Sequence, residues 1–353
     1  MTLPFVWSDA VLSHEPVLEV WVGKETPGTE VPYRAHLIRD ALTGAGHPEL
    51  PAAAHDDDVL LDVHEAPLVE WLRTASEAWA KGPYEELMGQ SLAVPYVFPT
   101  PMMTAGMPWR YPTATHARAG VWCYDTMTAV GPGTWEAARA AVDCALTAVD
   151  LVVSGTHRTA YALCRPPGHH AAPAGFGGSC YLNNAAVAAQ ALTRHGRRVA
   201  VVDVDAHHGN GTQAVFWRRA DVFYGSVHVD PGAGWFPHVL GFADETGDGE
   251  GKGTTLNVPL APASGDIEWV EAVARVCEAA LESRPDAIVV SLGVDAAAAD
   301  PESPLRVSDA GFAGTGRLLA SLDLPTVLVQ EGGYHLPSLG PLVRSVLAGF
   351  DAP

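Results

Sequence analysis

Short runs of aliphatic and β-branched residues alternate along the chain with longer segments that have the apolar periodicity of amphipathic helices. This alternation is typical of βαβ units around a parallel sheet, whose buried strands are continuous apolar runs. The expected strands are residues 160–164, 199–205, 222–229, 287–295 and 326–333. The expected helices are residues 134–150, 184–196, 267–282 and 309–322, with Asp266 and Ser308 as the N-caps of the last two.

The pattern favours one α/β domain over residues 1–353. No linker or shift in composition interrupts the region from residue 165 to residue 335, where the polar candidates described below lie. The least regular stretch is residues 87–124, which is rich in proline, methionine and aromatic residues and contains no aspartate or glutamate. Long loops of this kind are commonly lids. We therefore take residues 87–124 as a candidate entrance loop.

Four of the expected strands end in polar residues that a buried strand does not need. These ends are residues 165–170, 203–208, 293–295 and 331–334. In open α/β sheets the carboxyl ends of parallel strands line the ligand crevice. We therefore expect these four segments to meet at one site.

A metal site is the first chemistry that these strand ends indicate. Asp205 and His207 are two residues apart, so extended backbone places their side chains on the same side. Asp295, at the end of another strand, supplies a third ligand. An isolated Asp-x-His is more often a surface turn, but here the other strand ends favour a site. Two carboxylates and one imidazole with an open position make a catalytic site, for which Zn²⁺ is the usual ion and Fe²⁺ a substitute.

Proton transfer and carbonyl activation are the second chemistry. Two adjacent imidazoles, His169 and His170, acquire different pKa values when their partners differ, and Asp203 and Asn210 are the candidate partners of His169 and His170 respectively. Tandem histidines are otherwise commonly a surface feature. Tyr334 follows two glycines that allow a sharp turn, so its phenol can stabilise an oxyanion.

Composition excludes several classes of function. The formal net charge of −20 and the lack of a Lys/Arg cluster argue against a nucleic-acid partner. The five cysteines form no CxxC pair, which argues against a disulfide framework and favours a reducing, cytoplasmic location. No signal peptide or apolar run long enough to span a bilayer is present, so we expect no membrane association.

The ordered motifs resemble one known family. RPPGHHA, GFGGSCYLNN, DVDAHHGNGTQ, SLGVD and EGGYH are similar to the zinc-dependent histone deacetylase superfamily, and most similar to its bacterial acetylpolyamine amidohydrolase branch. The resemblance extends from about residue 120 to about residue 345. It implies the arginase–deacetylase fold, which is one α/β domain with a mainly parallel sheet flanked by helices.

The resemblance also implies residue roles. Asp205, His207 and Asp295 would be the zinc ligands. His170 would carry the proton, with His169 as its electrostatic partner. Asp203 would orient His169, and Tyr334 would polarise the acyl carbonyl. Arg34 would lie beneath the site.

Family members bind a structural monovalent cation, K⁺ or Na⁺. The resemblance implies that Asp203, Ser226 and the backbone carbonyls of Asp205, His207 and Val227 hold it here. A second cation would use carbonyls in the range 216–222. The branch further suggests a homodimer with the long entrance loop at its interface.

The substrate-binding residues depart from the family pattern. Many relatives place an aromatic residue on one wall of the acyl-lysine tunnel, where this chain has Ser179, while Phe236 supplies the opposite wall. The tunnel should therefore be wider on one side. Gly178, beside Ser179, is a further substrate-binding candidate. Glu302 resembles a carboxylate at the mouth of polyamine-selective members. One feature argues against a polyamine substrate. Relatives that cleave acetylpolyamines place carboxylates along the entrance, whereas residues 87–124 contain no acidic residue and offer Arg110, His116 and Arg118 instead.

We therefore expect a metal-dependent hydrolase that removes acetyl or another acyl group from a small amine, with an acetylpolyamine first among the candidates. Protein acetyl-lysine and secondary-metabolite amides are alternative substrates. A non-catalytic sensor of acylated ligands on the same fold is an alternative of a different class. A binuclear manganese site is disfavoured because His208 stands where a second metal would need a carboxylate.

Overall fold

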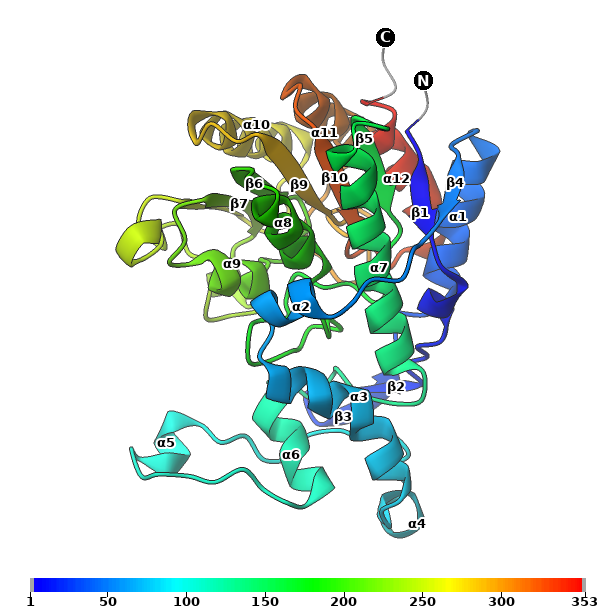
Figure 1. Cartoon of the computed structure of the whole chain (residues 1–353), viewed down its shortest axis with the longest axis vertical. Helices are drawn as coiled ribbons and strands as arrows, with labels where there is room; N and C mark the ends of the chain where they lie inside the picture. Colours follow the sequence, from blue (N-terminus) through cyan, green and yellow to red (C-terminus); the bar gives the residue numbers. More distant parts are fainter. Residues whose placement is uncertain (1–2, 351–353) are drawn as a thin grey trace.

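A parallel β-sheet forms the centre of the molecule in the computed structural model, which describes residues 3–350 (Figure 1). Its strand order is β4-β1-β5-β10-β9-β6-β7-β8, and all neighbouring strands are parallel. The strands are β1 Phe5–Trp7, β4 Glu49–Pro51, β5 Thr159–Ala162, β6 Val199–Asp203, β7 Val222–Val229, β8 Thr255–Leu260, β9 Ala287–Leu292 and β10 Thr326–Gln330. The α/β architecture with a parallel sheet that the sequence predicts is confirmed.

Helices cover both faces of this sheet (Figure 1). On one face α7 and α8 pack on the strands, and on the other α10 contacts β6, β7 and β8 beside α11, α12 and α1. The helices are α1 Tyr33–Gly44, α2 Asp58–Val63, α3 Ala66–Ala80, α4 Tyr84–Met88, α5 Pro101–Thr104, α6 Thr115–Trp122, α7 Thr134–Val153, α8 Asn184–Arg194, α9 Asn210–Phe216, α10 Asp266–Glu282, α11 Asp309–Ser321 and α12 Leu336–Leu347. Every residue of β6, β9 and β10 is buried, which explains their continuous apolar sequences.

One of the two predicted helix caps is wrong. Ser308 caps α11, where its hydroxyl accepts a hydrogen bond from the backbone N–H of Ala310 at 3.2 Å. The N-cap of α10 is Gly265, and Asp266 is the first helical residue. The Asp266 carboxylate is engaged elsewhere, because it accepts hydrogen bonds from the backbone N–H and the hydroxyl of Ser308.

The segment 87–124 is more regular than the sequence suggests, since it contains the helices α5 and α6. Together with α3, α4 and the hairpin of β2 Leu18–Trp21 and β3 Lys24–Pro27, it lies below the sheet in Figure 1, with α5 at the tip of an extended arm. Within residues 3–350, no helix combines the length and the apolar character that crossing a membrane requires.

Candidate metal centre and active site

The four polar segments follow strands that are neighbours in the sheet. Strands β5, β10, β9 and β6 are adjacent in that order, and all four run parallel. Their carboxyl ends therefore meet at one edge. This arrangement brings residues 165–170, 331–334, 293–295 and 203–208 together, although they are far apart in the sequence.

The donor atoms of Asp205, His207 and Asp295 form a compact cluster, with all three within 4.8 Å of one another. His207 Nδ1 lies 3.0 Å from Asp295 Oδ2 and 3.4 Å from Asp205 Oδ1. Backbone amides hold both carboxylates: Gly332 N–H donates to Asp205 at 2.8 Å, and Ala206 N–H donates to Asp295 at 2.8 Å. The cluster is thus fixed by three separate strand ends.

This donor set fits a divalent metal. His207 Nε2 donates a hydrogen bond to the backbone carbonyl of Glu302 at 3.1 Å, so Nδ1 is the nitrogen that faces the two carboxylates and would coordinate a cation there. Burial, together with the nearby charge of Asp205, raises the pKa of Asp295. A cation between the two carboxylates would remove this repulsion, and one nitrogen with two oxygens suits Zn²⁺ or Fe²⁺.

The two imidazoles of the tandem histidine have different partners. His169 Nδ1 donates to Asp203 Oδ2 at 3.0 Å, and His170 Nδ1 donates to Asn210 Oδ1 at 2.8 Å. Burial alone would lower the pKa of His169, but the carboxylates of Asp205 and Asp203 outweigh it and raise this pKa to about 10. Burial, followed by the neighbouring charge of His169, lowers the pKa of His170. The arrangement therefore provides one cationic and one neutral imidazole.

Tyr334 is held over the site by its neighbours. Its backbone N–H donates to Asp300 Oδ2 at 2.7 Å. The guanidinium carbon of Arg34 lies 4.7 Å from the centroid of the Tyr334 ring, and Arg34 also donates to the backbone carbonyls of Gly333 and Glu331. Arg34, which the resemblance puts beneath the site, is a buried residue of α1 that holds this segment. These contacts fix the phenol without occupying its hydroxyl group.

A cavity of about 460 Å³ leads to the cluster. It is lined by Glu19, Trp21, Thr26, Pro27, Thr29, Met127, His170, Gly178, Ser179, His207, Gly234, Trp235, Phe236, Pro301, Glu302 and Tyr334. All four substrate-binding residues predicted from the sequence, namely Gly178, Ser179, Phe236 and Glu302, are among them.

The walls near the metal cluster are tightly packed. Phe236 meets His170 edge-on, with ring centroids 4.7 Å apart. Gly178 has a φ of +58°, and a Cβ atom there would lie 2.3 Å from Cδ2 of His170. Glycine is therefore required at position 178. Its backbone N–H donates to Asp125 Oδ2 at 2.6 Å, and Ser179 N–H donates to Thr128 Oγ1 at 2.9 Å.

Glu19 is a cavity residue that the sequence did not reveal. It lies on the β2–β3 hairpin, and its Oε1 accepts hydrogen bonds from the N–H and the hydroxyl of Thr29 at 3.1 and 3.4 Å. Burial raises the pKa of Glu302, and the Thr29 side chain opposes this rise. Burial, opposed by Thr29 and reinforced by the charge of Glu302, raises the pKa of Glu19 to about 7. The cavity thus carries two neighbouring carboxyl groups.

Tyr124 is a second residue that the sequence did not reveal. Its hydroxyl donates to the backbone carbonyl of His170 at 2.7 Å, and the same oxygen accepts a hydrogen bond from Asn210 at 3.3 Å. Tyr124 thereby joins the His170 backbone to the side chain that orients the His170 ring. No spacing or motif indicated this contact, because Tyr124 is the last residue of the segment 87–124, whose sequence has no regular pattern.

The basic residues of the segment 87–124 lie away from the cavity. His116 Nδ1 is 3.0 Å from the Tyr84 hydroxyl, and Arg118 donates to the carbonyl of Pro112. Arg110, His116 and Arg118 do not contribute to the lining, whose outer part comes from the β2–β3 hairpin. The expectation that these cations replace acidic residues at the mouth is therefore corrected: the hairpin supplies the acid Glu19.

The predicted monovalent-cation residues are next to one another in the sheet. Asp203 and Ser226 pair across the β6–β7 ladder, and Val227 follows Ser226. Asp203 Oδ1 accepts the N–H of Asp205 at 3.2 Å. The second predicted cation range, residues 216–222, joins the end of α9 to β7. Both cation sites stay predictions.

Comparisons with known proteins agree with this geometry. Residues 28–350 match the histone deacetylase domain. An acetylpolyamine amidohydrolase of Mycoplana ramosa is 41% identical over 333 residues, which are 94% of each chain, and acetylpolyamine amidohydrolase 1 of Pseudomonas aeruginosa is 39% identical over 354 residues, 98% of each. The crystal structure of an acetylpolyamine aminohydrolase from Burkholderia pseudomallei has a TM-score of 0.92 and 37% identity, with 99% of both chains covered. The chain belongs to the histone deacetylase family.

Proposed function

We propose that this protein hydrolyses the amide of an acetylated, cationic small amine, an acetylpolyamine or a close analogue. The observation that carries the proposal is one cavity in which His170, Tyr334 and Glu302 surround the metal-ligand cluster. Similar proteins are named acetylpolyamine amidohydrolases, which supports the same substrate class. Asp205, His207 and Asp295 would hold Zn²⁺, with Fe²⁺ as a substitute.

The bound metal would supply Lewis-acid polarisation of the acyl carbonyl and of the attacking water. His170, neutral and with its Nδ1 proton donated to Asn210, accepts the water proton at Nε2 and delivers it to the leaving amine. His169, cationic beside Asp203, stabilises the negative charge that develops. The Tyr334 phenol donates its proton to a hydrogen bond with the carbonyl oxygen.

Recognition of the amine would use the two carboxyl groups of the cavity. A distal ammonium of the substrate is attracted by Glu302 and Glu19, both of which line the passage to the ligand cluster. Ser179 leaves one wall without an aromatic ring, so acyl groups larger than acetyl are not blocked there. Protein acetyl-lysine and secondary-metabolite amides are the alternative substrates that this wider wall favours.

Three further parts of the proposal concern the whole protein. K⁺ or Na⁺ would bind at Asp203 and Ser226, with backbone carbonyls of Asp205, His207 and Val227. A homodimer is supported by the α5 arm (Figure 1). Its apolar side chains are exposed, and Met102 is 91% exposed. The cytoplasmic location stays a prediction, consistent with five buried cysteines that form no disulfide.

A substrate screen tests the proposal. The purified, metal-loaded protein is incubated with N-acetylated polyamines, acetyl-lysine peptides and neutral acetylated amines, and the released amine is measured directly. We expect the highest kcat/KM on acetylpolyamines. Equal rates on peptides would favour the protein-lysine alternative. Binding of acetylated amines without release of amine or acetate would favour the sensor.

A further inference from the structure

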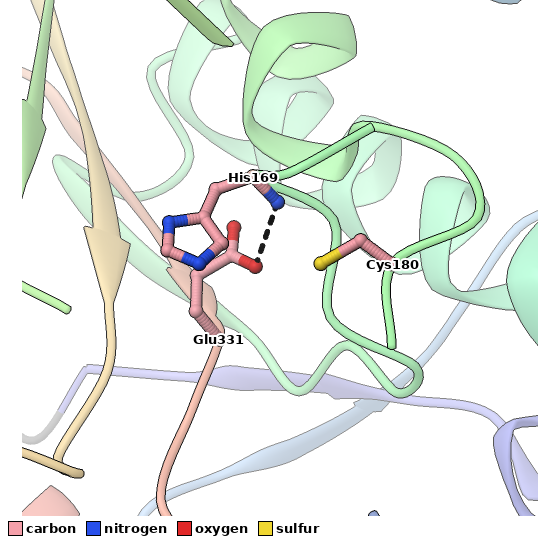
Figure 2. Close-up of side chains that lie close together, drawn as sticks. All are labelled: His169, Cys180 and Glu331. Atoms are coloured by element: carbon pink, nitrogen blue, oxygen red, sulfur yellow. Dashed lines mark hydrogen bonds between the residues drawn. The ribbon is translucent and has the colours of Figure 1, made fainter. Parts of the chain in front are cut away.

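A second cluster of metal-binding side chains lies next to the proposed catalytic site. It consists of His169, Cys180 and Glu331, whose donor atoms all lie within 4.8 Å of one another (Figure 2). The three residues come from the segment after β5, the loop before α8 and the end of β10. At most 2% of each residue is exposed, so the cluster is enclosed by protein.

One buried carboxyl oxygen of this cluster lacks a hydrogen-bond partner among residues 3–350. Glu331 Oε2 accepts hydrogen bonds from the backbone N–H groups of Gly168 and His169 at 2.7 and 3.2 Å. Glu331 Oε1 is buried and has no hydrogen-bond partner among residues 3–350. An unsatisfied buried carboxyl oxygen is costly and calls for an explanation such as a bound ion. Figure 2 shows the Cys180 sulfur directed toward the Glu331 carboxylate.

We propose that His169, Cys180 and Glu331 form a second binding site for a thiophilic divalent cation, Zn²⁺ above all, and that filling this site inhibits the enzyme. A set of one nitrogen, one sulfur and one oxygen suits Zn²⁺, whereas Mg²⁺ and Ca²⁺ prefer oxygen ligands alone. This donor set differs from that of the first site by its thiol. The difference allows the two sites to be distinguished by spectroscopy.

A cation that fills the second site must displace protons. Burial raises the pKa of the Cys180 thiol and raises that of Glu331 to about 8, so both groups carry protons that the cation must displace. Inhibition follows because a cation bound to His169 removes that imidazole from its role in hydrolysis. This consequence rests on the proposed function, but binding of the cation does not.

Cobalt substitution tests the binding. Protein with one equivalent of Co²⁺ is titrated with a second equivalent, and the thiolate-to-cobalt absorption in the near ultraviolet is recorded with the metal content per chain. Asp205, His207 and Asp295 contain no sulfur, so this absorption reports on the second site. We expect it to appear with the second equivalent. A single equivalent at every concentration, or a second one without the absorption, would overturn the proposal.

Two cysteine variants test whether Cys180 supplies the thiolate and whether the second site causes the inhibition. Excess Zn²⁺ should lower the wild-type rate roughly 10²-fold, the usual cost of removing one group that stabilises the developing negative charge. Cys180→Ser should lose the absorption and should show nearly the same rate with and without excess Zn²⁺. Cys277→Ser, a buried cysteine of α10, should behave as the wild type. Absorption or inhibition that persists in Cys180→Ser rules out the site.

A misfolded Cys180→Ser variant and an absence of hydrolysis can each be distinguished from the absence of the second site. Should Cys180→Ser not fold, the absorption of the wild type decides, because the other metal-ligand cluster of the described residues lacks cysteine. If no acetylated amine is hydrolysed, the proposed function is wrong. The cobalt absorption and the metal content would still establish or overturn the second site.

Discussion

His207 and Glu302 are joined by a hydrogen bond, with His207 Nε2 3.1 Å from the backbone carbonyl oxygen of Glu302. A proposed metal ligand is therefore fixed by the same residue whose carboxyl group lines the cavity. This bond orients the imidazole and makes the metal site depend on the segment after β9. Substitutions of the Glu302 side chain should preserve it, because it uses the backbone.

Metal removal should abolish hydrolysis. The donor set of Asp205, His207 and Asp295 is the one complete cluster that opens to the cavity within residues 3–350. We expect that chelation stops amine release and that Zn²⁺ or Fe²⁺, at one ion per chain, restores it. Amine release is followed together with metal content. Full activity in metal-free protein would contradict the mechanism.

Tyr334→Phe should lower kcat about 10² to 10³-fold, the usual cost of removing one oxyanion donor. The Arg34 contact involves the ring and the backbone, so the phenylalanine ring should keep the same position. Metal content and thermal unfolding serve as controls and should not change. A kcat near that of the wild type would show that the phenol does not act on the carbonyl.

His170→Ala should reduce kcat more than Tyr334→Phe does, by about 10³-fold or more, because proton transfer to the leaving amine is lost. Its partner Asn210 would also lose a hydrogen bond that measures 2.8 Å. The rates are compared on the best substrate found in the screen. A smaller loss than in Tyr334→Phe would assign the proton transfer to another residue.

Glu302→Gln and Glu19→Gln should each lower kcat/KM for acetylpolyamines about two- to five-fold and leave kcat for neutral acetylated amines unchanged. The effect should weaken at high salt because screening reduces charge attraction. Glu25→Gln is the matched control, since Glu25 is exposed on the same hairpin. Equal losses on both substrate types would remove the argument for a cationic substrate.

The preference for cationic substrates should depend on pH through Glu19. Its raised pKa of about 7 means that the side chain is neutral below this pH and a carboxylate above it. The ratio of kcat/KM for cationic over neutral substrates should therefore rise between about pH 6 and pH 8. Glu19→Gln should flatten the rise. A ratio that falls with pH would contradict the role of this carboxylate.

The sequence predicts the centre of this protein better than its periphery. Strands such as β6 and β9 are buried on both faces, so their apolar runs are unmistakable, and the polar residues after them indicate the site. Edge strand β4 has the sequence Glu-Leu-Pro, which has no strand signature. The strand β1 has only three residues, too few for any periodicity.

Glu19 could not be found in the same way. It belongs to a short, largely solvent-facing hairpin, and its neighbours in the cavity lie far away in the sequence. Its role depends on where the tertiary structure places that hairpin. The basic residues of the segment 87–124 are a different case, because none of Arg110, His116 and Arg118 lines the cavity. The role of this segment as an entrance loop stays a prediction.

The position of β10 affects how the protein can be made in the cell. This strand follows β9 in the chain but lies between β5 and β9 in the sheet. During synthesis, β5 and β9 therefore leave the ribosome before the strand that joins them, and they expose unpaired edges to chaperones or to other nascent chains. Glu331 and Tyr334 directly follow β10 in the chain, so the candidate site is completed only after this strand has been made.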